Sequence, residues 1–311
     1  MTRLPNRLES DRSNMTERHY WVDLGNSSLK VLTLRVVTSG GSELESGDLS
    51  SDDWQAIGRR EPDAVSRLAS AAPVTFASPA ELIASLPVPP EDLVEPERWT
   101  IASVNPPALH QLLDMLSARP AAHSPLVLQA DDFPIPLEID FPERLGLDRL
   151  AAATAAAALR EAGHGAIVID AGTATTVDAV DASGQFRGGA ILASPALMLK
   201  ALGAHTRLLP TLSDEFAAAP PTAIGRNTEA ALRSGAFWGQ VGAIQALIDQ
   251  QSLVLRSWSP SAARSRDQLE PIDVMLCGGV ADLLGEHLRP RPRRWPGLVL
   301  AGIAIAAASR S

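Results

Sequence analysis

Carboxylate, glycine and hydroxyl side chains gather directly after an apolar segment in the middle of the chain. Residues 167–169 are all β-branched, which predicts a short buried strand, and Asp170 ends this strand with a carboxylate. Gly172 lets the backbone turn close to a ligand, and the threonines within 173–176 supply hydroxyls and backbone N–H groups. A carboxylate holds a cation, whereas hydroxyls and N–H groups bind anionic oxygens. The stretch therefore favours a turn that binds a phosphate together with its cation.

Taken alone, this turn could equally be an ordinary connection between two strands, but a second copy lies upstream. Apolar residues 20–22 run into Asp23, Gly25 follows two residues later, and a second apolar segment covers 30–37. The Asp-x-Gly pattern thus occurs twice, each time in a predicted hairpin. Two related half-domains facing each other across a cleft would bring both turns to one nucleotide.

A third carboxylate, Asp148, lies at the start of an alanine-rich segment that predicts a helix over 150–162. The field of a helix N-terminus favours a carboxylate and, all else equal, lowers its pKa. The neighbouring Arg149 could orient a carboxylate ligand or simply pair on the surface. From these residues alone, a plain first-turn aspartate and a catalytic one are equally good interpretations.

The rest of the sequence predicts strands and helices in alternation, which is typical of a two-lobed α/β fold. Besides the two hairpins, the patterns predict strands at 99–105, 126–128, 135–139, 188–192 and 272–276, and helices at 54–69, 107–116, 150–162, 195–203, 224–248 and 298–308. We interpret the polar residues 1–19 as a disordered N-terminal extension, residues 20–162 as one lobe and residues 163–311 as the other.

Composition excludes several classes of function. The 311 residues suffice for about two domains, and the net charge of −9 argues against nucleic acid as a partner. The longest strongly apolar run, 297–308, is too short to span a bilayer, and residues 1–19 lack the apolar core of a secretory signal. Cys277 is the one cysteine, so no intrachain disulfide forms, and we expect a buried structural thiol. These features predict a cytoplasmic protein that does not enter a membrane.

Walker-type ATP binding is also excluded, because neither of the two lysines, Lys30 and Lys200, follows a Gly-x-x-x-x-Gly segment. The paired Asp-x-Gly turns instead resemble the two phosphate motifs of the actin, hexokinase and Hsp70 superfamily of ATP-binding proteins. Within that superfamily, the chain is similar to the type III pantothenate kinases from about residue 20 to its end. The matching segments, in chain order, are 23–30, 146–149, 170–176, 188–189, 208–210, 224–228 and 277–279.

The resemblance implies a duplicated, two-lobed actin-like ATPase fold of the ribonuclease H-like type. It also implies ATP-dependent phosphorylation of pantothenate to 4′-phosphopantothenate, the first step of coenzyme A biosynthesis. The implied ATP-binding residues are Asp23, Leu24, Gly25, Asn26, Ser27, Ser28, Leu29, Lys30 and Thr173. The implied pantothenate-binding residues are Gly146, Leu147, Asp148, Arg149 and Thr228, the last reaching the substrate across a homodimer interface.

Three carboxylates receive further roles from the same resemblance. It implies that Asp148 is the general base, that Asp170 binds a potassium or ammonium ion, and that Asp23 holds Mg²⁺ through water. The sequence departs from the family pattern at two positions near the substrate. Ile139 or a neighbour stands where the family has a tyrosine, and Ala196 stands where a glycine is usual.

Two other functions stay open at this point. One is a catalytically silent regulatory or accessory binding protein of the same family, some members of which were first described as accessory transcription factors. The presence of both Asp148 and Asp170 disfavours it. The other is a kinase of the same superfamily that acts on a different small hydroxyl compound, which the isoleucine at position 139 keeps open.

Overall fold

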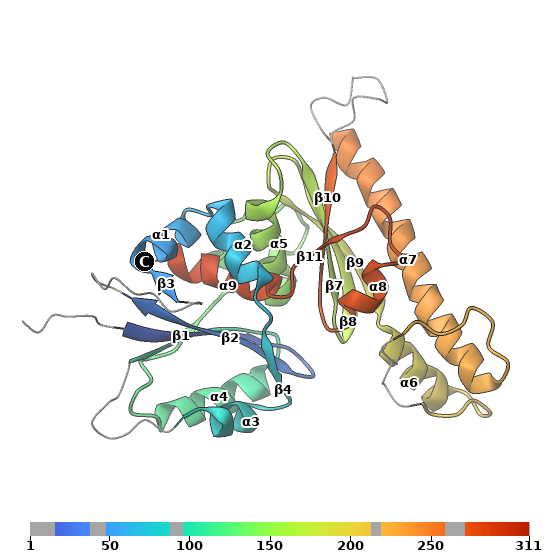
Figure 1. Cartoon of the computed structure of the whole chain (residues 1–311), viewed down its shortest axis with the longest axis horizontal. Helices are drawn as coiled ribbons and strands as arrows, with labels where there is room; N and C mark the ends of the chain where they lie inside the picture. The colour runs from blue at the N-terminus through green and yellow to red at the C-terminus, as the bar shows by residue number, and fades with distance from the viewer. Residues whose placement is uncertain (1–15, 38–47, 88–95, 213–218, 259–270, 311) are drawn as a thin grey trace, which may run out of the picture.

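The computed structural model describes residues 16–37, 48–87, 96–212, 219–258 and 271–310. These residues form two β-sheets, with one group of helices between the sheets and further helices on their outer faces (Figure 1). The predicted two-lobed α/β fold class is confirmed.

Each sheet is built around a hairpin. The strands of the first sheet are β1 (Thr16–Leu24), β2 (Leu29–Val37), β3 (Leu49–Ser50), β4 (Val74–Phe76), β5 (Glu97–Ser103) and β6 (Leu126–Val127). The strands of the second sheet are β7 (Gly165–Ala171), β8 (Ala174–Val180), β9 (Phe186–Ala193), β10 (Ile272–Cys277) and β11 (Arg293–Arg294). The order is β3-β2-β1-β5-β6 in the first sheet, with β4 also on β2, and β11-β10-β7-β8-β9 in the second.

The two sheets share one topology. In the first, β2 is antiparallel to β1 and β5 is parallel to β1; in the second, β8 is antiparallel to β7 and β10 is parallel to β7. The outer strands continue the correspondence, because β4 and β9 are antiparallel to β2 and β8, and β6 and β11 are parallel to β5 and β10. The predicted duplication is therefore present in the strand order itself.

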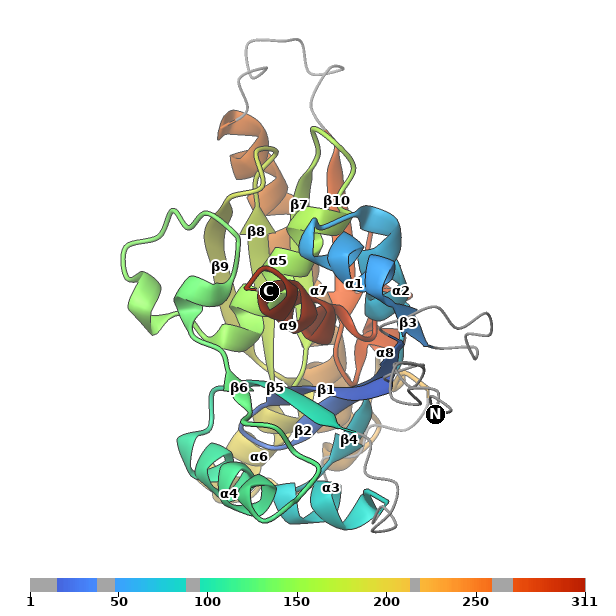
Figure 2. The same ribbon diagram turned by 90° about the vertical axis from the view of Figure 1, so that its left-hand side faces the viewer.

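Helices cover both faces of each sheet. Their bounds are α1 (Ser51–Gly58), α2 (Pro62–Ser70), α3 (Pro79–Ser85), α4 (Pro106–Ser117), α5 (Leu147–Leu159), α6 (Pro195–His205), α7 (Thr228–Trp258), α8 (Ala281–Gly285) and α9 (Leu298–Ala308). Helices α1, α2, α5 and α9 lie between the sheets, α3 and α4 lie outside the first sheet, and α7 lies outside the second (Figures 1 and 2).

Alternation along the central strands explains this layering. Tyr20 and Val22 of β1 pack toward α3 and α4, whereas Trp21 between them packs toward the central helices. In β7, Ile167 packs toward α7, whereas Val168 packs toward the centre. Successive strand residues point to opposite faces, and these strands are apolar on both because both faces are covered.

Small residues bring the two central helices, α5 and α9, into close contact. The α5 alanines 151–153 and 155–156 are buried, and a side chain at Gly302 of α9 would collide with the backbone of Ala151. Helix α9 is buried almost throughout, although it follows the second sheet in sequence, and it packs against α1, α2 and β1. The predicted boundary between the two lobes, after residue 162, stays a prediction. Helix α9 belongs by sequence to the second lobe but packs against elements of the first.

Several sequence predictions require correction. Strand β1 begins at Thr16, so residues 16–19 belong to the sheet, while residues 1–15 of the predicted disordered extension lie outside the described residues. The helix predicted over 54–69 is two helices, because the chain turns after Gly58 and Pro62 begins α2.

The strand predicted over 135–139 is also absent. That segment makes a single bridge, between Leu137 and Phe186, so its apolar residues cover the edge of the second sheet without joining it as a strand. Helix α7 continues to Trp258, beyond the predicted end at 248. Cys277 is buried, as predicted. Within the described residues, every helix is too short or too polar to cross a bilayer.

Candidate active site

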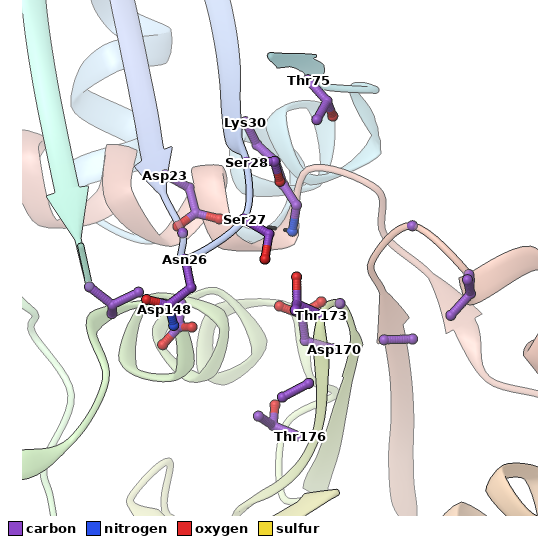
Figure 3. Close-up of a pocket in the computed structure, with 17 residues that line it drawn as sticks. Asp23, Asn26, Ser27, Ser28, Lys30, Thr75, Asp148, Asp170, Thr173 and Thr176 are labelled. Carbon is purple, nitrogen blue, oxygen red and sulfur yellow. Dashed lines mark ion pairs between the residues drawn. The ribbon is translucent and has the colours of Figure 1, made fainter. Parts of the chain in front are cut away.

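The two Asp-x-Gly turns face each other across one cavity of about 330 Å³ (Figure 3). The first turn contributes Asp23, Gly25, Asn26, Ser27, Ser28 and Lys30, and the second contributes Asp170, Ala171, Gly172, Thr173, Ala174 and Thr176. Asp148 from the start of α5 joins them, together with Thr75, Val104, Gly279 and Val280. The predicted meeting of the two turns at one site is therefore observed.

In the first hairpin, a carboxylate and an ammonium group occupy one register position. Asp23 of β1 pairs with Lys30 of β2, and the Lys30 Nζ lies 3.9 Å from the Asp23 Oδ2. The turn is closed by the Gly25 N–H, which donates to the Ser28 carbonyl at 3.1 Å. Asn26 and Ser27 lie at its exposed tip, where their polar groups face the cavity (Figure 3).

Burial dominates the electrostatics of this hairpin. It raises the pKa of Asp23 to about 7, with the carboxylates of Asp170 and Asp148 adding to the rise and Lys30 opposing it. The carboxylate of Asp170, more than that of Asp23, raises the pKa of Lys30. Without a ligand, the site therefore has an excess of carboxylates over cations, and a metal ion bound near Asp23 would relieve it.

In the second hairpin, the same register position carries a hydroxyl. Asp170 of β7 pairs with Thr176 of β8. The Asp170 Oδ1 is buried and has no hydrogen-bond partner in the described part of the chain. A buried carboxylate oxygen without a partner is costly, and a cation is the ligand that satisfies it. Asp170 therefore fits the monovalent cation that the resemblance implies.

Asp148 lies in the first turn of α5, where its Oδ1 accepts a hydrogen bond of 2.8 Å from the Arg149 N–H. The sequence predicted that the helix N-terminus would lower its pKa. That prediction held all else equal, and the net shift is upward. Burial raises the pKa of Asp148 and the charge of Asp170 adds to the rise, against the Arg149 N–H at the helix start, the Arg149 guanidinium and Lys30. A raised pKa suits a general base that works near neutral pH.

Glycine at position 146 makes room for this carboxylate. A Cβ built on Gly146 would lie 2.5 Å from the Asp148 Oδ1. Any side chain there would displace the carboxylate from the position that it holds over the start of the helix. Gly146 therefore shapes the position of the Asp148 carboxylate without lining the cavity itself.

Arg149 makes an internal ion pair that the sequence did not predict. Its Nε lies 3.1 Å from both carboxylate oxygens of Asp178 on β8, and its Nη2 also donates to that carboxylate. The Asp178 side chain is 2% exposed, and the backbone of Gly189 packs directly on it. The pair is therefore buried and is not the surface pair that the sequence left open. The Arg149 Nη1 makes no hydrogen bond within the described residues. A charged residue in the apolar strand 177–180 was the signal that could have identified Asp178.

Not every predicted site residue lines the cavity. Leu24 and Leu29 are buried in the core under α3 and α4, where they anchor the first turn. Three others do not line the cavity, namely Gly146, Leu147 and Arg149. Thr228 is exposed at the start of α7. The structure adds Thr75, which pairs in register with Lys30. Sequence reasoning missed it because residues 40–98 carry no recognisable motif.

Two facing Asp-x-Gly hairpins in a duplicated α/β fold define a two-lobed protein of the actin-like ATPase class, with the carboxylate of Asp148 in the same cavity. A family sequence model described as type III pantothenate kinase matches residues 21–250. The chain belongs to the type III pantothenate kinase family.

Individual relatives agree with this assignment. The type III pantothenate kinase of Halorhodospira halophila is 32% identical over 286 residues, which cover 91% of this chain and 94% of that protein. That of Rubrobacter xylanophilus is 39% identical over 166 residues, which cover 53% of this chain and 58% of that protein. A solved Campylobacter jejuni structure, named for the Baf family of transcriptional activators, aligns over 94% of this chain and 98% of its own with a TM-score of 0.50 and 16% identity. That likeness concerns the fold alone.

Proposed function

We propose that this protein transfers the γ-phosphoryl group of ATP to the primary hydroxyl of pantothenate, which yields 4′-phosphopantothenate and ADP. The observation that carries the proposal is the position of Asp148 between two facing phosphate-type turns, in a chain of the type III pantothenate kinase family. Phosphoryl transfer depends chiefly on positioning and charge neutralisation, and this cavity is lined by groups suited to both.

The first hairpin would bind the phosphates of ATP. Lys30 supplies a positive charge, which its raised pKa maintains at neutral pH. Hydrogen-bond donors come from Asn26, Ser27 and the backbone of the turn. The carboxylate of Asp23 would hold Mg²⁺ through water, and the raised pKa of Asp23 supports this role, because a nearby cation would offset the burial of the carboxylate. Asp170 would bind potassium or ammonium through its unpartnered oxygen, with Thr173 near the nucleotide. Bound cations supply neutralisation of the phosphate charge.

Asp148 would act on the acceptor. Its carboxylate takes the proton of the pantothenate hydroxyl as the hydroxyl oxygen bonds to the γ-phosphorus, and the bond from that phosphorus to the bridging oxygen of ADP breaks. Arg149 would pair with the pantothenate carboxylate through its remaining N–H groups. Asp178 holds the guanidinium in place for this role.

We also infer a homodimer that completes the substrate site. Thr228 lies outside the cavity of its own chain, at the exposed start of α7. Along the same helix a side chain at Gly235, Gly239 or Gly242 would meet no other atom within 4 Å, which leaves room for a second copy. Mixing an Asp148→Asn chain with a Thr228→Ala chain should restore activity, because one composite site in the heterodimer is intact. An active monomer in sedimentation would contradict the shared site.

A coupled ADP-release assay tests the proposed reaction. Purified protein with ATP, Mg²⁺ and potassium should release ADP only when pantothenate is added, and not with a panel of other small alcohols and sugars. Selective release with another hydroxyl compound would favour the broader kinase function, and no release with any acceptor would favour the silent binding protein. The substrates and the family support a cytoplasmic location.

A further inference from the structure

A second cavity, of about 640 Å³, lies at the opposite end of α5 from Asp148. Three arginines line it from separate segments: Arg59 and Arg60 from the turn between α1 and α2, and Arg160 from the C-terminal cap of α5. The described lining contains no carboxylate and shares no residue with the cavity that holds Asp148. Thirteen helical residues separate the two sites by roughly 20 Å. We name the three residues the distal arginine cluster.

Arg160 carries hydrogen-bond donors that the fold does not use. Its Nε is buried and has no partner in the described part of the chain, and its Nη1 makes only a long contact of 3.5 Å to the Glu161 carbonyl. Buried donors without partners are uncommon and call for an explanation. The guanidinium packs on the turn between β8 and β9, where its Nη2 would lie 2.9 Å from a Cβ at Gly184. The Nε does not face the cavity as the side chain stands, but Arg160 lines the cavity, and its Nη groups would donate to a ligand there.

The carboxylates nearest to Arg160 have other partners. Asp181 accepts hydrogen bonds from the backbone of Ser183 and Gln185, and Asp273 accepts from the Glu161 N–H and contacts His164. Neither forms an ion pair with Arg160 within the described residues. They act on it only at longer range, against the burial that lowers its pKa.

Arg60 occupies a backbone position at which glycine is the usual residue. Its φ is +60°, and the Arg60 and Glu61 N–H groups bond to the carbonyls of Ile57 and Ala56, which is the Schellman arrangement at the end of α1. A side chain in this left-handed conformation is strained. This strained conformation places the guanidinium of Arg60 at the cavity, where its Nη1 donates to the Pro134 carbonyl at 2.9 Å.

Arg59 adds charge at the rim. It pairs with Glu61 at 2.8 Å, but both side chains are more than half exposed, so the pair is weak and can open. Guanidinium groups bind phosphate oxygens in pairs of parallel hydrogen bonds, and several of them around one cavity suit a group with more than one negative charge. We propose that the distal arginine cluster binds the phosphate group of a small molecule, as a phosphomonoester or a diphosphate, outside the kinase cavity.

Calorimetric titration with pyrophosphate and with inorganic phosphate, in magnesium-free buffer, tests this site. A Lys30→Met background removes the lysine of the kinase cavity, and pyrophosphate binding should persist in it. Adding Arg60→Gly or Arg160→Gln should weaken that binding by about 10-fold or more each, because charge-assisted hydrogen bonds are lost. Tighter binding of pyrophosphate than of phosphate would identify a diphosphate ligand, and equal binding a phosphomonoester.

Arg60→Gly separates binding from folding, because glycine is favoured at this φ and the variant should unfold at the same or higher urea concentration. Arg291→Gln is the matched control, since that exposed arginine lies outside the cavity and pairs with Glu286 at 3.6 Å. The proposal is overturned if pyrophosphate binding disappears with Lys30→Met alone, or if Arg60→Gly and Arg160→Gln bind it as tightly as the control. The test is independent of the proposed kinase activity.

Discussion

The β1–β2 and β7–β8 hairpins have the same topology and carry the same Asp-x-Gly turn, but they differ in the residue that pairs with the aspartate. Opposite Asp23 the first hairpin has Lys30, whereas opposite Asp170 the second has Thr176. The lysine of the first hairpin lies 3.9 Å from Asp23, and its charge also acts on Asp170 across the cavity. A buried oxygen of Asp170 still has no hydrogen-bond partner within the described residues. We propose that this difference within a repeated framework separates a phosphate-binding turn from a cation-binding turn.

In the proposed function, the same difference is a reason why neither hairpin would supply the base. Asp23 faces a lysine and Asp170 would face a bound cation, so each carboxylate would serve charge neutralisation. Asp148 comes from α5, outside both hairpins, and its hydrogen bond comes from the Arg149 N–H instead of a lysine. The predictions below test this division of roles, beginning with the largest expected effect.

Removing the carboxylate of Asp148 should have the largest effect on activity. A small effect would contradict the division of roles between Asp148 and the two hairpins. Asp148→Asn should lower kcat by about 10²- to 10⁴-fold, because the hydroxyl proton has no acceptor, while ATP binding changes little. Steady-state kinetics measure this, with Asp140→Asn, an exposed carboxylate on the preceding loop, as the control. Near-wild-type turnover would show that Asp148 is not the base.

Paired substitutions at the distinguishing register position should have unequal effects. Lys30→Met should lower kcat/KM for ATP by about 10²-fold, because a positive group that faces the phosphates is lost. Thr176→Val, which removes only a hydroxyl, should lower it by less than about 10-fold. Equal losses in the two variants would show that the hairpins contribute alike to phosphate binding.

The cation response should belong to the second hairpin. We expect potassium or ammonium to activate the wild type relative to sodium. Asp170→Asn should reduce that activation by about 10-fold, because an amide oxygen holds a cation less firmly than a carboxylate does. Rates measured in matched potassium and sodium buffers test this. Unchanged activation in Asp170→Asn would place the cation elsewhere.

Substitution of Asp23 should give the smallest effect, and this effect should be on the free energy of unfolding. Its folded pKa of about 7 lies above the ordinary value of 3.8, so its contribution to stability is full below about pH 4 and is lost as pH rises through 7. Asp23→Asn should therefore raise the free energy of unfolding at pH 8, by about 1–4 kcal/mol, and change it little near pH 4. Urea denaturation without magnesium or nucleotide measures this, with the exposed Asp114→Asn as the control. A pH-independent difference would contradict the raised pKa.

The local sequence pattern was sufficient to predict the two hairpins. In each, a run of apolar residues indicates a buried strand, and the Asp-x-Gly segment that follows indicates a turn. The pKa of Asp148 could not be predicted in the same way. The helix field is a local effect, whereas the burial that outweighs it comes from elements far apart in the chain. Asp178 and Thr75 were missed for a related reason, since each is identified by its partner, Arg149 or Lys30, across the fold.

The errors in the fold have equally specific causes. Residues 54–69 have continuous helical periodicity, so the reversal at Arg60, in a conformation usually taken by glycine, had no sequence signal except Pro62. Residues 135–139 are apolar because they cover the second sheet, which a one-dimensional pattern does not distinguish from a strand. Both errors lie away from the paired turns.

The most direct test of the division between the hairpins is a potassium titration of the Thr176→Lys variant beside the wild type. The substitution gives the second hairpin the residue that the first one has, and it places an ammonium group opposite Asp170 in the cavity. The account predicts that the wild type is activated by potassium, whereas Thr176→Lys is active without it and shows a flat response. A variant that keeps the wild-type potassium dependence, with the same half-saturating concentration, would contradict the account.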